Sequence, residues 1–124
     1  MGKLTEGEWA VLNALWTGDR LTLGEVTAAL DPALRWRRNT VLTYLTRMEG
    51  KGLVTIHRQE EPHRYAAAVT REACARQERS RLLDRVYQGA AGDLIAAFLK
   101  ESSISPEERD RLRKLLELSR DLSE

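Results

Sequence analysis

Residues 35–54, RWRRNTVLTYLTRMEGKGLV, predict a helix with two chemically different faces. At 3.6 residues per turn, one stripe is apolar and consists of Val41, Tyr44, Leu45 and Met48. The opposite side carries Asn39, Thr43, Thr46 and Gly50. Short hydrogen-bonding side chains suit DNA base edges, because Asn pairs with adenine and Thr bonds a base or contacts a thymine methyl group. Taken alone, this pattern fits an ordinary amphipathic helix with a solvated face equally well.

The residues after this helix favour the DNA-reading alternative. Gly50-Lys51-Gly52 supplies glycine for the left-handed position at which many helices end. The segment LVTIHR, residues 53–58, is short and rich in β-branched residues, as strands are. QEEP, residues 59–62, predicts a polar turn, and HRYAAA, residues 63–68, predicts the returning strand. A helix followed directly by a hairpin is typical of a winged helix, in which the hairpin is the wing.

The predicted wing carries both basic and acidic residues near its tip. Arg58, His63 and Arg64 are placed to reach the DNA backbone. Glu60 and Glu61 argue against deep insertion into a groove, because carboxylates are repelled by the phosphates. We therefore expect the flanks of the wing to make backbone contacts only.

Two further helices are predicted before residues 35–54, and each begins with a capping box. Thr5 with Glu8, and Thr22 with Glu25, have the spacing in which each side chain bonds the other residue's amide. The first helix is expected to run to near Gly18 and the second to end before residues 31–32, since a residue preceding proline is disfavoured in a helix. The first helix carries an apolar stripe that includes two of the three tryptophans, which we expect in the core: Trp9, Val11, Leu12, Leu15 and Trp16. Leu21-Thr22 is a candidate third strand.

The region from residue 70 onward predicts three further helices. A charged helix spans residues 70–87, GAAG at 89–92 breaks it, and a short apolar helix covers residues 93–100. SPEE, residues 105–108, places serine at the cap and proline at the first helical position of the last helix. Leucines follow at 112, 115, 116, 118 and 122. The expected fold is thus mostly α with a small β-wing: a winged helix-turn-helix domain over residues 1–69 and a helical dimerisation region over residues 70–124.

These last helices hold more apolar residues than they can bury alone, so a second copy of the chain is the expected cover. The predicted dimerisation set is Leu83, Val86, Tyr87, Leu94, Ile95, Phe98, Leu112, Leu115 and Leu116. Isologous pairing would place two reading heads about one DNA turn apart, which matches a palindrome. The alternative is a three-helix cap folded back on the N-terminal half.

Composition narrows the class of protein. The chain of 124 residues has a net charge of only +1, so nucleic-acid binding requires a local basic patch. The middle of the chain supplies one: Arg35, Arg37, Arg38, Arg47, Lys51, Arg58 and Arg64. The absence of a long apolar run or a signal peptide predicts a soluble cytoplasmic protein.

The sequence offers no pattern for a metal, a cofactor or an enzyme. Cys74 is the single cysteine, which fits a reducing compartment, and His57 and His63 have no third ligand nearby. Neither a nucleophile–base pair nor a phosphate loop is present, so we expect no catalysis. A redox-sensing role for Cys74 is the alternative that the residues leave open.

Three segments resemble the BlaI/MecI/CopY family of penicillinase and methicillin-resistance repressors: TEGEWAVLNALW (5–16), NTVLTYLTRMEGKGLV (39–54) and HRYAAAVTREA (63–73). The resemblance implies a homodimeric winged-helix repressor that binds a dyad operator. It also implies recognition positions at residues 39, 40, 42, 43 and 47, with the helix start at residues 37–38 and wing positions at 58 and 64. The predicted DNA-contact set is Arg37, Arg38, Asn39, Thr40, Leu42, Thr43, Thr46, Arg47, Arg58, His63 and Arg64.

The chain departs from that family in three places. Antibiotic-sensing members are cleaved at an Asn-Phe pair, and the matching pair here is Ala97-Phe98. Copper-sensing members carry a C-terminal cysteine cluster, whereas this chain ends SRDLSE. Leu42 stands where several relatives carry a charge. The altered pair argues against release by cleavage at that site, and the residues leave an inactivating protease and a small-molecule inducer open. We expect a sequence-specific repressor; the alternative is a winged-helix module whose arginines bind an acidic protein.

Overall fold

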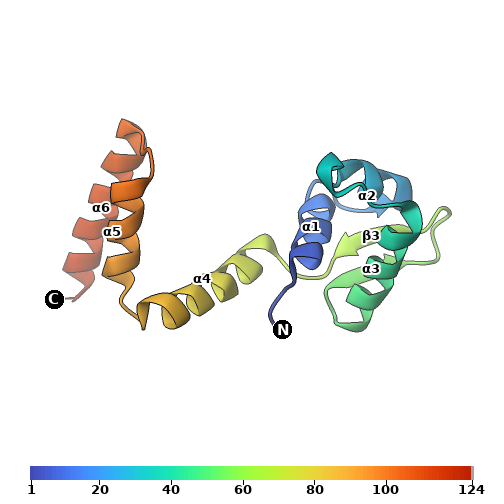
Figure 1. Ribbon diagram of the computed structural model, residues 1–124, viewed down its shortest axis with the longest axis horizontal. Coiled ribbons are helices and arrows are strands. Elements are labelled where there is room, and N and C mark those ends of the chain that lie inside the picture. The colour runs from blue at the N-terminus through green and yellow to red at the C-terminus, as the bar shows by residue number, and fades with distance from the viewer. Residues whose placement is uncertain (124) are drawn as a thin grey trace. The chain divides into compact units, whose positions relative to one another are not determined.

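The computed structural model describes the backbone of residues 1–123 and the side chains of residues 1–120. Its elements are α1 (Glu6–Leu15), β1 (Leu21–Thr22), α2 (Leu23–Ala29), the 3-10 turn η1 (Pro32–Leu34), α3 (Arg38–Gly50), β2 (Val54–His57), β3 (Arg64–Ala67), α4 (Arg71–Tyr87), α5 (Ala91–Glu101) and α6 (Pro106–Ser123) (Figure 1). The chain forms two compact units, Met1–Arg79 and the part from Ser80 onward. The predicted fold class, mostly α with a small β-wing, is confirmed.

Both predicted capping boxes are formed. The Glu8 amide donates to Thr5 Oγ1 at 3.1 Å, and the Thr5 amide donates to Glu8 Oε1 at 2.9 Å. The corresponding distances for Thr22 and Glu25 are 3.2 and 2.9 Å. α1 ends at Leu15, earlier than predicted, although turn hydrogen bonds continue to Gly18. These caps satisfy amides that an α-helix leaves without partners in its first turn.

The core of the N-terminal unit lies between α1, α2, α3 and the sheet. Its fully buried side chains come from all three helices and from the start of α4: Val11, Leu12, Leu15, Val26, Val41, Leu45, Met48 and Cys74. Trp9 and Trp16 were expected inside the core, but they pack against its edge and stay partly exposed. Their rings meet edge to face at 6.3 Å, and Trp16 Nε1 donates to the Val69 carbonyl oxygen at 3.0 Å. An indole with a polar N–H packs readily in such a position.

The sheet has the order β1-β3-β2 and is antiparallel throughout. Leu21 pairs with Tyr65, so the candidate third strand is confirmed, and Ile56 pairs with Tyr65 on the other side. The two wing strands are shorter than predicted, four residues each. Gly52, with φ 77°, occupies the left-handed position after α3, while Gly50 is still helical. The Leu53 amide then donates to the Met48 carbonyl oxygen at 2.9 Å, which turns the chain into the wing.

The C-terminal unit consists of the end of α4 together with α5 and α6. α4 stops at Tyr87, where Gln88 and Gly89 adopt positive φ, and α5 begins two residues earlier than predicted. The Glu108 amide donates to Ser105 Oγ at 3.1 Å, which confirms the predicted start of α6. The side chain of Leu122, the last residue of the predicted leucine pattern, lies outside the described part. Among the described residues, no helix has the length and apolar character needed to cross a membrane.

Candidate nucleic-acid interface

α3 exposes a wide polar face to solvent, and its opposite face is buried in the core. Val41, Leu45 and Met48 are each 0% exposed. The residues predicted to read DNA from this helix are all exposed: Asn39, Thr40, Leu42, Thr43, Thr46 and Arg47. The periodicity of the sequence therefore assigned the inward and outward faces of α3 correctly.

The hydrogen bonds on this face determine what it offers to a ligand. Thr43 Oγ1 donates to the Asn39 carbonyl oxygen and Thr46 Oγ1 donates to the Leu42 carbonyl oxygen, both at 2.9 Å. The two hydroxyl groups have used their hydrogens within the helix, and they retain oxygen lone pairs and methyl groups for outside partners. No hydrogen bond of the Asn39 amide group occurs within the described residues. The face thus combines a free amide, hydroxyl acceptors and methyl groups.

The start of α3 is suited to an anion. Arg37 is the N-cap residue, and no side chain caps the helix there, so the first-turn amides remain available. The side chains of Arg37 and Arg38 are exposed. Arg38 also lines a surface hollow of about 400 Å³ together with His63 of the wing. Tertiary structure thus brings together two predicted DNA-contact residues that lie 25 positions apart in the sequence.

Both wing arginines form ion pairs with carboxylates. Arg58 donates two hydrogen bonds to Glu49, at 2.6 and 2.8 Å. Arg64 donates to the Arg20 carbonyl oxygen at 3.1 Å and lies 3.6 Å from Glu25. These pairings have no local signal in the sequence, because the partners come from other elements.

The two carboxylates at the tip of the wing each lie near a basic residue. Glu60 lies 3.4 Å from Arg20, and His63 Nε2 lies 3.8 Å from Glu61. His57 pairs with Arg64 in the sheet, so the two histidines are not directly opposite each other. Among the side chains described for residues 1–120, no group of three potential metal ligands comes together.

Sequence reasoning missed a buried carboxylate behind α3. Glu8 is only 4% exposed, and its Oε2 accepts from Lys51 Nζ at 2.8 Å. Burial raises the pKa of Glu8, but the hydrogen bonds from Lys51 and Thr5 lower it by more, so the net pKa is below its ordinary value. The contact ties the first turn of α1 to the end of α3. The capping box predicted the bond from Thr5, whereas Lys51 lies 43 residues away and had no local signal.

Cys74 is a core residue in this structure. Its side chain is 1% exposed, and burial raises the pKa of the thiol. Because the thiolate is the reactive form, such a thiol is poorly reactive in the folded state.

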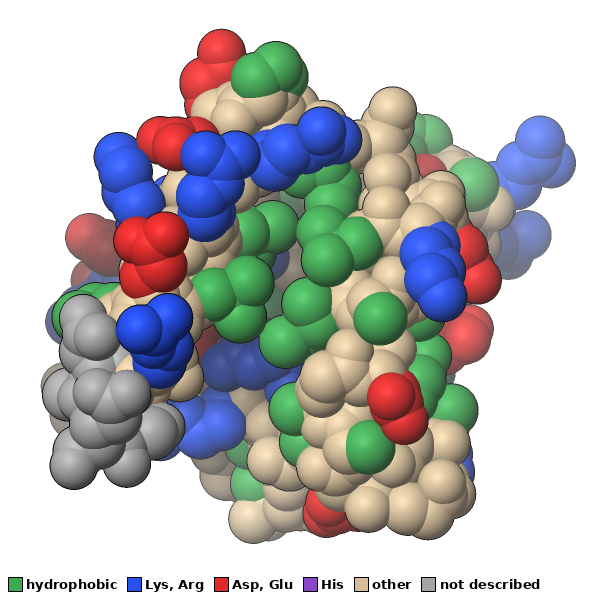
Figure 2. All heavy atoms as spheres, turned by 90° about the vertical axis from the view of Figure 1, so that its left-hand side faces the viewer, with side chains coloured by type: hydrophobic (Ala, Val, Ile, Leu, Met, Phe, Trp, Pro, Cys, Tyr) green, Lys and Arg blue, Asp and Glu red, His purple; other side chains and the backbone are tan. Residues whose placement is uncertain are grey.

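The C-terminal unit leaves much of its apolar surface uncovered. None of the side chains described between residues 80 and 120 is buried. Within the predicted dimerisation set, Leu83, Tyr87, Leu94 and Leu112 are half-buried, whereas Val86, Ile95, Phe98, Leu115 and Leu116 are between 43% and 60% exposed. Figure 2 shows hydrophobic side chains gathered in the hollow between two ridges of this unit. Ala97 and Phe98, the pair that the sequence resemblance matches to a cleavage site, lie inside helix α5.

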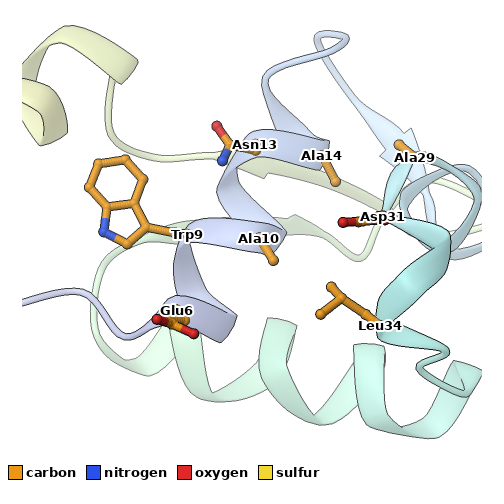
Figure 3. Close-up of a pocket in the computed structure, with 8 residues that line it drawn as sticks. All are labelled: Glu6, Trp9, Ala10, Asn13, Ala14, Ala29, Asp31 and Leu34. Atoms are coloured by element: carbon orange, nitrogen blue, oxygen red, sulfur yellow. The ribbon is translucent and has the colours of Figure 1, made fainter. Parts of the chain in front are cut away.

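A separate hollow of about 650 Å³ lies beside α1. Asp31 and Leu34 face α1 across it, and Trp9 lies at its edge (Figure 3). None of the predicted DNA-contact residues lines this hollow. It is therefore distinct from the exposed face of α3.

Comparison with known proteins agrees with the family suggested by the motifs. The methicillin resistance regulatory protein MecI of Staphylococcus aureus strain N315 is 21% identical over 114 residues, covering 92% of this chain and 93% of that protein. The penicillinase repressor of Bacillus licheniformis is 24% identical over 115 residues, covering 93% and 90%. A solved structure on regulation of DNA binding of Bordetella bronchiseptica BpsR by 6-hydroxynicotinic acid matches with a TM-score of 0.45 and 21% identity, covering 94% of this chain and 76% of that one.

The family model described as "Penicillinase repressor" matches residues 4–118. This match spans nearly the whole chain, including both compact units. The chain therefore belongs to the penicillinase repressor family of transcription regulators.

Proposed function

We propose that the protein is a homodimeric, sequence-specific DNA-binding repressor that acts in the cytoplasm on an operator with dyad symmetry. The observation that carries the proposal is the exposed face of α3, whose polar residues project outward while the opposite face is fully buried. An exposed helix face with an amide, hydroxyl acceptors and methyl groups has the groups needed to distinguish base pairs in a major groove. An ordinary solvated helix would instead carry mainly Lys and Glu.

Each part of the interface has a distinct chemical role in this proposal. Asn39 pairs with an adenine, because its amide has both a donor and an acceptor free. Thr43 and Thr46 contact bases through their methyl groups or accept hydrogen bonds, since their hydroxyl hydrogens are already donated within α3. Thr40, Leu42 and Arg47 complete the reading face.

Phosphate contacts supply the remaining part of the affinity. The uncapped amides at the start of α3 and the side chains of Arg37 and Arg38 are proposed to bind the DNA backbone. His63 shares a hollow with Arg38, so a phosphate between them would join the wing to the helix. Both predicted wing contacts, Arg58 and Arg64, have carboxylate partners in the free protein, and of the two only Arg64 is proposed to contact a phosphate.

The test is binding of the purified protein to its own upstream DNA and to a scrambled duplex across a salt series. We expect a strong preference for the upstream DNA, and Thr43→Ala should weaken this binding by about 1–3 kcal/mol. Thr17→Ala is the matched control, because Thr17 also donates its hydroxyl to a backbone carbonyl, of Ala14, but lies outside α3. Equal binding to both duplexes, or equal effects of the two substitutions, would contradict the assigned reading face.

The exposed apolar surface of the C-terminal unit supports the dimer. Phe98, Leu115 and Leu116 are each more than half exposed, and a surface that exposes several large apolar side chains commonly marks an interaction site. A second copy of the chain would remove this surface from water, and each side chain fully covered would contribute about 1.5–3 kcal/mol.

Sedimentation equilibrium tests the dimer directly. We expect Leu116→Glu to shift the protein toward monomer, because a carboxylate would have to be buried in the interface. Leu34→Glu provides the control, since Leu34 is also exposed but belongs to the N-terminal unit. A wild-type protein that stays monomeric at micromolar concentrations would rule out this dimer.

The rival function is a winged-helix module that binds an acidic protein through its arginine cluster. It predicts no preference between upstream and scrambled DNA, so the same binding experiment separates the two. Release by a protease or by a small-molecule inducer also remains a proposal.

A further inference from the structure

A side-chain pair connects the end of β2 nearest the wing tip to α3. Arg58 follows β2 directly, and Glu49 lies in the last turn of α3. Arg58 Nη1 donates to Glu49 Oε2 at 2.6 Å, and Arg58 Nη2 donates to Glu49 Oε1 at 2.8 Å. Two parallel hydrogen bonds between planar groups fix orientation as well as distance.

The pair is placed so that it restrains the wing. The chain leaves α3 through residues 51–53 and enters β2 at Val54, so this turn is one connection between helix and hairpin. The Glu49–Arg58 pair is a second connection, at the opposite end of β2. With both ends of the strand held, the hairpin has less freedom to swing about the turn.

The electrostatics favour Glu49 as the lasting partner of Arg58. The hydrogen bonds from Arg58 lower the pKa of Glu49, and those with Glu49 raise the pKa of Arg58. A phosphate that captured Arg58 would leave the Glu49 carboxylate unpaired beside a polyanion. Exchange of partners would therefore replace one charge pair by another and add a repulsion.

We propose that Glu49 and Arg58 are positioning residues that set the angle of the wing against α3, and that Arg58 supports DNA binding through Glu49 instead of by a phosphate contact. This inference rests on the proposed DNA-binding function. Arg58 thus has a role different from the direct DNA contact that its position on the wing suggests.

Two single substitutions, one for each member of the pair, distinguish a positioning role of Arg58 from a phosphate contact. In the positioning role, Glu49→Gln and Arg58→Gln each weaken operator binding by about two- to fivefold, the range for loss of an exposed ion pair. The slope of log affinity against log salt stays that of the wild type, because no phosphate contact is lost. A phosphate role for Arg58 predicts that Glu49→Gln strengthens binding and that Arg58→Gln lowers the slope by about one.

Charge reversal supplies a second test. The double substitution Glu49→Arg with Arg58→Glu should bind the operator more tightly than Arg58→Glu alone, because the pair is restored with its charges exchanged. A double variant that binds no better than Arg58→Glu would overturn the proposal. Glu72→Gln and Arg79→Gln are matched controls: they break an exposed Arg–Glu pair of 2.8 Å on α4. Each control should change operator affinity by no more than the removal of any one exposed charge does.

A measurement without DNA separates this proposal from the proposed function. Glu49→Gln and Arg58→Gln should speed amide hydrogen exchange in Val54–His57 severalfold, whereas the α4 controls should not. Unchanged exchange in this strand would refute the positioning role whatever the protein binds. Faster exchange in a protein that does not prefer its upstream DNA would instead refute the proposed function and leave the restraint intact.

Discussion

Gly7 provides a sharp test of how α1 packs against α3. A Cβ atom added at Gly7 would lie 2.7 Å from both Cε1 and Cζ of the Tyr44 ring, and closer still to its hydroxyl oxygen. The ring cannot simply turn aside, because it stacks on Trp36 with centroids 4.4 Å apart and planes inclined by 21°. Gly7→Ala must therefore displace Tyr44 and disturb the stack.

The expected change in the free energy of unfolding follows from three contributions, of which one favours alanine and two disfavour it. Ala is favoured over Gly in a helix by up to about 1 kcal/mol. Inserting a methyl group into a packed site costs about 1–3 kcal/mol, and loss of an aromatic pair costs about 0.5–1.5 kcal/mol. Gly7→Ala should thus lower the free energy of unfolding by about 2 kcal/mol, the opposite sign from helix propensity alone.

Urea unfolding at one fixed protein concentration measures this effect, since dimerisation would make stability depend on concentration. Gly24→Ala is the control, because an added Cβ there would meet only Thr22 Oγ1 at 4.0 Å, and it should be neutral or slightly stabilising. In a Tyr44→Ala background, Gly7→Ala should become stabilising. A stabilising Gly7→Ala in the otherwise wild-type protein would refute the packing argument.

Two further predictions concern ionisable groups in the core of the N-terminal unit. The pKa of Glu8 is lower in the folded state than its ordinary 4.5, so its contribution to stability is complete above that pH and is lost as the pH falls through the folded pKa. Urea unfolding of the wild type should show this acid-side loss, and Glu8→Gln should reduce it; an identical pH profile for the two proteins would contradict the assignment. Cys74, which is 1% exposed with a raised pKa, should react with a thiol reagent far more slowly in the folded protein than in denaturant. Rapid reaction of the native protein would revive the redox-sensing alternative.

The local features of the fold were predictable because each depends on neighbours within a few residues. The capping boxes at Thr5 and Thr22, the serine cap at Ser105 and the division of α3 into two faces all follow from spacings of three or four residues. The hairpin was equally clear from its first strand, which is rich in β-branched residues, and from its polar turn. Element ends were less accurate, as at Gly18 and Asp93, since turn hydrogen bonds extend or shorten a helix with little local signal.

The set of exposed residues on α3 also came from the sequence, because helical periodicity identifies the outward face once the inward face is apolar. Its role in binding DNA stays a prediction, as do the dimerisation set and the domain boundary at residues 69–70. The family motifs added the expectation of a repressor, and the match over residues 4–118 confirms membership of that family.

Tertiary structure alone decided which charges remain available and which are paired. Arg37 and Arg58 look alike in the sequence, yet Arg37 is exposed at an uncapped helix start whereas Arg58 is held by Glu49. Lys51 finds Glu8 across 43 positions, and Gly7 is required by a ring on another helix. Such contacts depend on how separate elements pack, and helical or strand periodicity contains no information about that. The sequence determined the elements and their faces, and the packing of those elements determined the partners.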